Sequence, residues 1–180
     1  MEKVTAKTLT TSGISKNGVN AEVANATGVY TATCYDSKGN VKWSDTYTNL
    51  VTTVGKNALL DTFLAGSGYT AAWYLGLVNT APTYDVTDPS ASHAGWTEVT
   101  AYSEATRNAP SWGSAAAGSK ATTATAFTIN GTATIAGTFL IDENTKGGTT
   151  GVLYSAGSFT GGDKSVASGD TLNVTYTASV

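Results

Sequence analysis

The stretch from Asn49 to Asn79 constrains the fold most, because it contains the only convincing helix pattern of the chain and, directly after it, a very apolar strand. The pattern predicts a helix over about Thr53–Leu64. Thr52 or Thr53 can cap its start, since a threonine hydroxyl accepts a hydrogen bond from a free N–H of the first turn. Residues 65–68 (Ala-Gly-Ser-Gly) predict its end, because glycine adopts the left-handed conformation without penalty.

The apolar residues of this helix spread over more than half of its circumference when they are placed about 100° apart. They are Val51, Val54, Ala58, Leu59, Leu60, Phe63 and Leu64. A helix that lies on one sheet usually shows a narrower apolar stripe. We therefore expect a sheet on one side of the helix and a loop or a second chain on the other. The three leucines and Phe63 are expected to anchor the domain, at about 1.5–3 kcal/mol for each buried side chain.

The strand that follows, Ala71–Val78, carries apolar residues on both of its faces. One face holds Trp73, Leu75 and Leu77, and the other holds Tyr74, Gly76 and Val78. A strand with two apolar faces is expected to be buried on both sides.

The composition predicts an all-β protein with this one helix. The chain has 180 residues, of which 20 are glycine and only 13% are charged, and it is rich in Thr, Ala, Ser, Val and Tyr. Thr, Val and Tyr favour strands, whereas Gly and Ser favour turns. About eight or nine strands with sandwich-like spacing can be counted. We predict an N-terminal arm over residues 1–27, followed by an antiparallel, jelly-roll-like β-sandwich domain over residues 28–180.

Two hairpins are predicted from turn signals. The strands 28–35 and 41–48 flank the turn Asp36–Asn40, and the strands 121–129 and 132–142 flank Asn130-Gly131, a strong two-residue hairpin signal. Between them, residues 79–100 form a long excursion, and residues 97–107 are predicted to pair as a strand. The final strand should present Leu172, Val174 and Tyr176 on one face.

Net charge, hydropathy and the cysteine count limit the partners and the cellular location that we expect. The net charge of −3 and the pI near 5.0 argue against nucleic acid, which calls for a basic stripe. No run of about 18 apolar residues that would span a membrane is present, and the N-terminus lacks the apolar core of a signal peptide. The single cysteine, Cys34, is expected to be a buried structural thiol. The sequence thus predicts a soluble protein that is made in a reducing cytosol.

The residue types that perform catalysis do not form a recognisable constellation. His93 is the only histidine, and Asp85 and Asp88 lie near it without a known metal-ligand spacing. Glu98 and Glu104 would lie roughly 20 Å apart on an extended strand, too far apart to act on one sugar or ester bond. The glycine clusters do not match phosphate-binding loops. We expect no enzymatic activity, no cofactor and no metal.

Without a catalytic or metal-binding pattern, the aromatic residues in loops and edge strands are the best candidates for a functional surface. Trp43, Trp96, Trp112 and Tyr84 are expected to be exposed, and exposed aromatic side chains mark protein contacts more often than catalysis. Tyr84, Trp96 and Trp112 are therefore candidate partner-binding residues.

The N-terminal arm allows two interpretations. It is a partly ordered tail, or it becomes ordered along a neighbouring subunit or the surface of another partner. Its low charge and its regularly placed apolar residues motivate the second interpretation. In that case Leu9 and Ile14 would be buried, while Lys3 and Lys7 would face acidic groups.

Several phrases, in order, resemble a set of small β-rich virion proteins of tailed bacteriophages. They are NLVTTVGKNALLD, AWYLGLVN, SHAGWTEVTAYSEATR, FTING, IAGTFLI, KGGTTGVLYS, FTGGDK and GDTL, and they lie between about Gly28 and Ser179. Some members of that set are described as head decoration or cement proteins. The first 27 residues have no counterpart in the resemblance.

The resemblance implies a structural protein that is added in many copies to the capsid surface, with the major capsid protein and copies of itself, as a dimer or trimer, as partners. It brings no catalytic motif. Two other functions stay open. One is a tail, fibre or other virion attachment module. The other is a carbohydrate-binding or hydrolytic β domain that uses Tyr84, Trp96 and Trp112.

Overall fold

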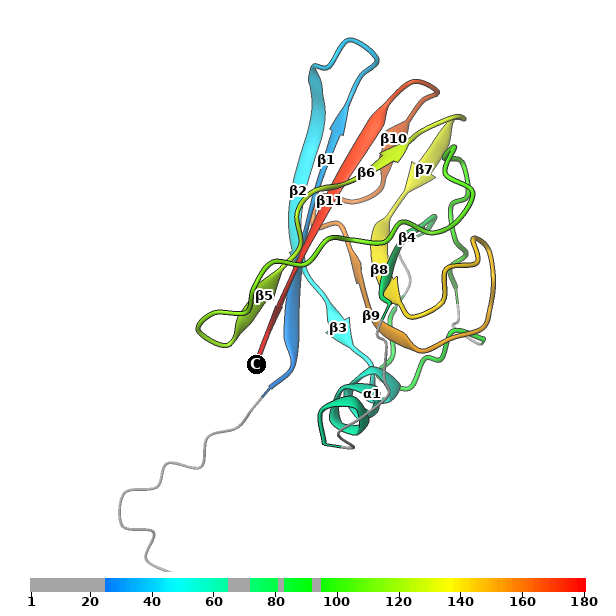
Figure 1. The fold of residues 1–180 in the computed structure, drawn as a ribbon. Coiled ribbons are helices and arrows are strands. Elements are labelled where there is room, and N and C mark those ends of the chain that lie inside the picture. Colours follow the sequence, from blue (N-terminus) through cyan, green and yellow to red (C-terminus); the bar gives the residue numbers. More distant parts are fainter. Residues whose placement is uncertain (1–24, 65–71, 81–82, 92–94) are drawn as a thin grey trace, which may run out of the picture.

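The computed structural model describes residues 25–64, 72–80, 83–91 and 95–180, and for residues 61–64 the backbone alone. Two antiparallel sheets form the layers of a sandwich (Figure 1). The first sheet runs β2 (Val41–Thr48), β1 (Thr27–Tyr35), β11 (Thr171–Ser179) and β5 (Ser119–Ala121), and β6 (Thr125–Thr128) also pairs with β11. The second runs β3 (Leu50–Val51), β9 (Leu153–Ser158), β8 (Gly137–Ile141) and β4 (Tyr74–Val78). A smaller sheet pairs β10 (Lys164–Val166) with β7 (Ala133–Ile135). The predicted antiparallel sandwich is confirmed.

The first hairpin is confirmed. β1 and β2 pair in antiparallel register, with Tyr30 opposite Tyr47. The turn between them places Gly39 at a φ of 85°, which glycine adopts easily. Asp36 closes the turn, because its Oδ1 accepts hydrogen bonds from the backbone N–H groups of Lys38 and Asn40, each at 2.8 Å.

The main core lies between the two layers and is rich in tyrosine. Tyr30 and Tyr176 have ring centroids 4.5 Å apart, and both side chains are fully buried. A buried tyrosine hydroxyl needs a partner. The Tyr30 hydroxyl lies 2.7 Å from Ser155 Oγ, and the Tyr47 hydroxyl lies 2.8 Å from Thr138 Oγ1. These hydroxyl pairs therefore join the first sheet to the second.

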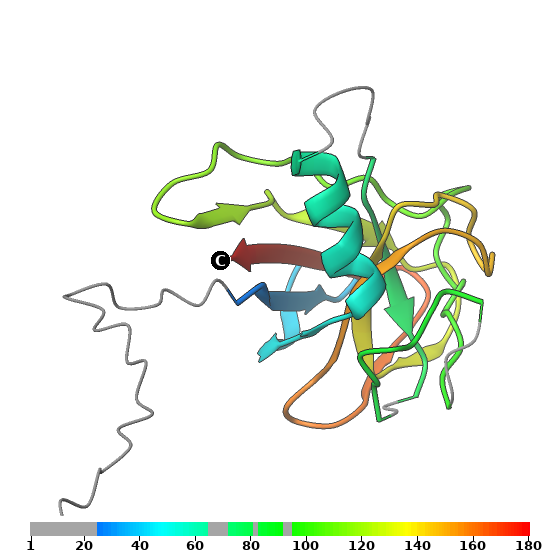
Figure 2. The same ribbon diagram turned by 90° about the horizontal axis from the view of Figure 1, so that it is seen from below.

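The helix α1 spans Thr53–Leu64, as predicted. Thr52 is its cap, since Thr52 Oγ1 accepts a hydrogen bond from the Gly55 N–H at 3.0 Å. Figure 2 shows α1 lying across one end of the sandwich. The prediction that Leu59 and Leu60 anchor the domain is wrong, because their side chains are 40% and 55% exposed. The helix packs along β9, and the close approach lies at its first turn, where a Cβ on Gly55 would lie 2.6 Å from the Tyr154 backbone oxygen.

The second predicted hairpin is wrong. Asn130-Gly131 does not join two paired strands, because β6 pairs with β11 whereas β7 pairs with β10. Gly131 is not among the glycines with positive φ, which a two-residue turn of this kind requires. The predicted strand 132–142 also divides at Ala136 into β7 and β8. Tertiary pairing of both flanking strands with other partners outweighs the local turn preference.

The strand predicted over Ala71–Val78 is β4, which begins at Tyr74, and burial on both faces is confirmed for Leu75–Val78. Leu75 and Leu77 belong to the main core, while Val78 belongs to a second apolar cluster on the other side of the sheet. Gly76 leaves room for a neighbouring ring, since a Cβ there would lie 2.1 Å from Phe139 Cζ. The chain that follows β4 covers this second face. The predicted strand over 97–107 is not formed, and only isolated bridges occur at Glu98 and Tyr102.

Candidate functional site

Trp96 is a core residue and not an exposed aromatic, so that expectation is wrong. Its side chain is 6% exposed and packs against Phe139, with ring centroids 5.2 Å apart. Tyr84 lies at the edge of the same cluster, 6.3 Å from Trp96 between ring centroids. Burial raises the pKa of Tyr84 to about 12, although the hydrogen bond from Ser158 lowers it. Trp96 is buried because the excursion after β4 folds back over the second sheet and must fill that face.

A buried ion pair holds this excursion in place. Arg107 Nη2 lies 2.9 Å from Glu98 Oε2, and Arg107 Nε donates to both carboxylate oxygens. Glu98 also accepts from the Gly147 N–H at 2.6 Å. The Arg107 guanidinium donates in addition to the backbone oxygens of Glu143 and Gly148. The pair therefore ties two loops together, and sequence spacing alone gave no sign of it.

The two glutamates considered as an acid/base pair are both held by structural contacts. Glu98 is neutralised by Arg107, and Glu104 accepts hydrogen bonds from the Thr128 backbone N–H at 3.0 and 3.2 Å. A cavity of about 190 Å³ lies beside Glu98 and Arg107. Its charged groups already satisfy each other, so it offers no free acid or base from these two residues.

Cys34 is buried, as predicted, and lies next to a charged pair. Its Sγ is 3.9 Å from Asp170 Oδ2, and Lys42 Nζ donates to the same oxygen. Burial raises the pKa of the Cys34 thiol to about 11, and the nearby Asp170 charge adds to this effect. A thiol with a high pKa is a poor nucleophile at neutral pH. Cys34 therefore has the properties of a structural residue.

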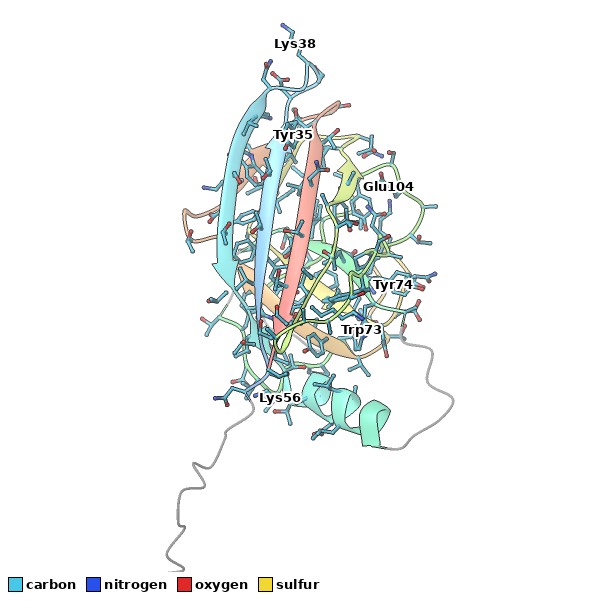
Figure 3. All side chains as sticks on the ribbon, turned by 60° about the vertical axis from the view of Figure 1, so that its left-hand side comes forward. Tyr35, Lys38, Lys56, Trp73, Tyr74 and Glu104 are labelled. Carbon is cyan, nitrogen blue, oxygen red and sulfur yellow. The ribbon has the colours of Figure 1, made fainter. Side chains whose placement is uncertain are left out.

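An apolar groove lies between α1 and the end of the first sheet, with a volume of about 300 Å³. It is lined by Leu59, Trp73, Trp112, Lys120, Leu140, Tyr154 and Ala178. Two of its aromatic side chains rest on core tyrosines. The Trp73 ring centroid is 5.2 Å from that of Tyr154, and the Trp112 centroid is 6.1 Å from that of Tyr176. Figure 3 shows Trp73 on the side of the molecule near α1.

This groove continues onto the exposed part of α1. Leu59 lines the groove, and Leu60 follows it on the helix, so apolar groove and apolar helix surface adjoin. Among the described residues that line the groove, Lys120 is the only charged one. Contiguous exposed apolar surface of this kind marks contacts with other molecules. We take the groove, together with Leu59 and Leu60, as the candidate functional site and call it the α1 groove.

The outer face of the first sheet is rich in hydroxyl side chains. Thr31 Oγ1 lies 3.0 Å from Thr46 Oγ1, and Thr33 Oγ1 lies 2.9 Å from Ser44 Oγ. The outward positions of the three long strands include Thr27, Thr31, Thr33, Ser44, Thr46, Thr48, Thr171, Asn173, Thr175 and Thr177. Such a face forms polar contacts without the positive charge that nucleic acid requires.

The residues predicted from sequence do not form one site. Trp112 lies at the α1 groove, whereas Trp96 and Tyr84 lie on the opposite face of the second sheet. Adjacent residues of β8 separate them, since Leu140 faces the groove and Phe139 faces Trp96. The three aromatic residues therefore do not form a common platform for a sugar.

Several predicted residues lie outside the described part of the chain. These are Lys3, Lys7, Leu9, Ile14 and His93, together with the predicted helix end at 65–68, and the side chains of Phe63 and Leu64 are likewise outside it. Sequence reasoning missed Trp73 and Lys120 as groove residues. The strand alternation placed Trp73 on the same face as Leu75, but the helix that forms the opposite wall was not predictable from that pattern.

The fold and the site define an antiparallel β-sandwich with the helix α1 at one end and an apolar groove beside it. Among the described residues, no helix has the length and apolar character needed to cross a bilayer, and no three acidic, histidine or cysteine side chains gather as a metal site would require. The sequence matches no protein-family model, and no curated protein matches it.

Proposed function

We propose that this chain is a structural virion protein of a tailed bacteriophage. In this proposal it binds the major capsid protein at the capsid surface in many copies and stabilises the head shell, as decoration or cement proteins do. The α1 groove is the observation that supports the proposal most. An apolar groove of about 300 Å³ beside Leu59 and Leu60, which are 40% and 55% exposed, is a surface suited to protein contacts.

Three charged side chains give further support to this proposal. Glu98, Arg107 and Asp170 are buried and serve structural pairs, so the chemistry of these groups supports a binding role without catalysis. The hydroxyl-rich outer face of the first sheet supports repeated weak contacts. Many copies on one shell bind with high avidity even when each contact is weak.

The particle itself provides the test. Virions purified from the producing strain are analysed by quantitative mass spectrometry, and density for the sandwich is sought in a cryo-electron microscopy map. We expect a copy number close to that of the major capsid protein and density on the head. A few copies located at the tail would support the alternative of a tail or fibre attachment module, whereas absence from the virion would overturn both.

The oligomeric state is tested separately. In this proposal the chain forms a dimer or trimer, because the α1 groove presents apolar surface to solvent in the single chain. Light scattering of the purified protein over a concentration series measures the mass. A strict monomer at all concentrations, combined with isolated single copies on the capsid, contradicts self-association.

A further inference from the structure

The position of the α1 groove relative to the first described residues is informative. Ala26 packs against the main core, and β1 begins at Thr27. The next residue, Gly28, pairs with Ala178, which lines the groove. The groove therefore lies at the same end of the sandwich as the point where residues 1–24 join the body (Figure 1).

The segment 1–24 has the composition that the groove requires. It contains an aliphatic residue every few positions, namely Val4, Leu9, Ile14, Val19 and Val23. The described residues that line the groove are aromatic and aliphatic apart from Lys120, and its volume of about 300 Å³ is at the lower limit of ligand pockets. A groove of this size and character accepts a few aliphatic side chains from an extended peptide better than a polar small molecule.

Chain direction favours a neighbouring copy as the source. β1 runs from Thr27 away from this end of the molecule, and the groove lies alongside Gly28. To fill its own groove, the chain would have to reverse direction just before Thr27, whereas a segment from a neighbour can enter without a reversal. A chain of 24 residues extends up to about 80 Å, and the radius of gyration of a domain of this size is roughly 15 Å. The segment is therefore long enough to bridge two copies.

We propose that the α1 groove binds the N-terminal segment, residues 1–24, of a neighbouring copy of this chain, with Leu9 or Ile14 between Trp73 and Trp112. This exchange of segments joins copies in a repeated array and so deepens the proposed function, on which its biological role rests. The binding event itself is a property of the purified protein and can be tested without a phage particle.

Cross-linking between full-length variants tests the proposal. Leu9→Cys protein is mixed with Lys120→Cys protein under mild oxidation, and Ile14→Cys replaces Leu9→Cys in a parallel experiment. The native Cys34 stays in place, because it is fully buried. The matched control is Lys38→Cys, an exposed lysine at the tip of the β1–β2 hairpin, at the far end from Lys56 on α1 (Figure 3).

We expect disulfide-linked dimers to form at least tenfold faster with Lys120→Cys than with Lys38→Cys for one of the two partners. Addition of Trp112→Ala to the Lys120→Cys protein should reduce the rate, with an unchanged melting temperature or circular dichroism spectrum as the check on folding. If Trp112→Ala perturbs folding, Ala178→Arg serves as the second block of the groove.

Two results overturn the proposal. One is equal cross-linking at Lys120→Cys and Lys38→Cys for both partners. The other is a double variant, Leu9→Cys with Lys120→Cys, that cross-links only within one chain at every concentration, which identifies the segment of the same chain as the occupant. If the cross-links form as expected but the full-length protein does not bind capsids, the proposed function is contradicted and the binding of the segment to the groove is not. Failure of the proposed function and failure of the groove proposal therefore give different results.

Discussion

Arg107 Nη2 lies 2.9 Å from Glu98 Oε2, and the two side chains are only 2% and 6% exposed. The same guanidinium lies over the Phe139 ring, with Cζ 5.2 Å from the ring centroid. The pair thus connects the excursion after β4, the loop that contains Gly147, and the apolar cluster on the second sheet. A buried charge of this kind is tolerated only while its partner remains in place.

Replacement of Arg107 with Met should therefore destabilise the fold strongly. The variant leaves Glu98 buried without its counter-charge, and we expect the free energy of unfolding to fall by about 3–5 kcal/mol. Guanidinium or urea denaturation measures the change. Lys164→Met is the matched control, because Lys164 Nζ lies 4.0 Å from Asp45, and loss of that contact should cost less than about 1 kcal/mol. Equal losses in the two variants would contradict the structural role of the buried pair.

The cap of α1 provides a second prediction. Thr52 Oγ1 accepts from the Gly55 N–H and also donates to the Leu153 backbone oxygen. Thr52→Ala removes both contacts at a buried position, and we expect a loss of about 1–2 kcal/mol. Thr53→Ala, at the exposed next residue, should change the free energy of unfolding by less than about 0.5 kcal/mol. If both variants unfold at the same denaturant concentration, Thr52 is not the cap that determines stability.

The pKa of Cys34 predicts a loss of stability at alkaline pH. Burial raises the pKa of this thiol from about 9 to about 11. A group with a raised folded-state pKa contributes stability that is fully present below pH 9 and is lost as the pH rises towards 11. Wild type should therefore lose free energy of unfolding faster than Cys34→Ala over this window, by at most about 1.4 kcal/mol per pH unit. Buried tyrosines affect both proteins alike, so parallel curves for the two proteins would contradict the prediction.

Asp170 predicts the opposite dependence in acid. Burial alone would raise its pKa, but the hydrogen bonds from Lys42 and from the Ala167 N–H outweigh burial, so the pKa lies below its usual value near 3.8. The stability that this carboxylate contributes is present above that value and is lost as the pH falls further. Asp170→Asn should be less stable at pH 7, by about 1–3 kcal/mol, and less sensitive to acid below pH 4.

The control for this acid dependence is the variant Asp163→Asn, because Asp163 is an exposed carboxylate in the turn after β9. Urea denaturation at a series of pH values should give a curve for Asp163→Asn that follows wild type. An acid limb of the same steepness in Asp170→Asn and wild type would mean that other carboxylates control acid stability.

Deletion of residues 2–24 tests the role of the N-terminal segment on the particle. Ala26 and β1 remain intact, so we expect the melting temperature to stay unchanged. Binding to capsids that lack the protein should weaken at least tenfold, because the contact that buries the aliphatic residues is lost. Sedimentation of capsids with labelled protein measures the bound fraction. If the shortened protein decorates capsids as fully as the intact chain, the segment is only a tail.

Local sequence pattern determined the elements whose partners are close in the chain. The hairpin of β1 and β2 and the span of α1 with its cap follow from residue preferences and turn chemistry that act within a few positions. The two-faced burial of β4 and the inward row of Leu172, Val174 and Tyr176 follow from simple alternation. These features depend on backbone preferences and periodicity, which a sequence carries directly.

Tertiary structure decided the features that depend on distant partners. Asn130-Gly131 has a strong hairpin preference, yet β6 and β7 pair with β11 and β10 instead. Trp96 becomes buried because the excursion that contains it folds back over β8, and Glu98 meets Arg107 and Gly147 only after that folding. The α1 groove exists because the helix, β5 and the end of β11 meet in space. Pairing energy and burial summed over the whole sandwich exceed the few tenths to about 1 kcal/mol of a local preference, so local pattern alone could not predict these contacts.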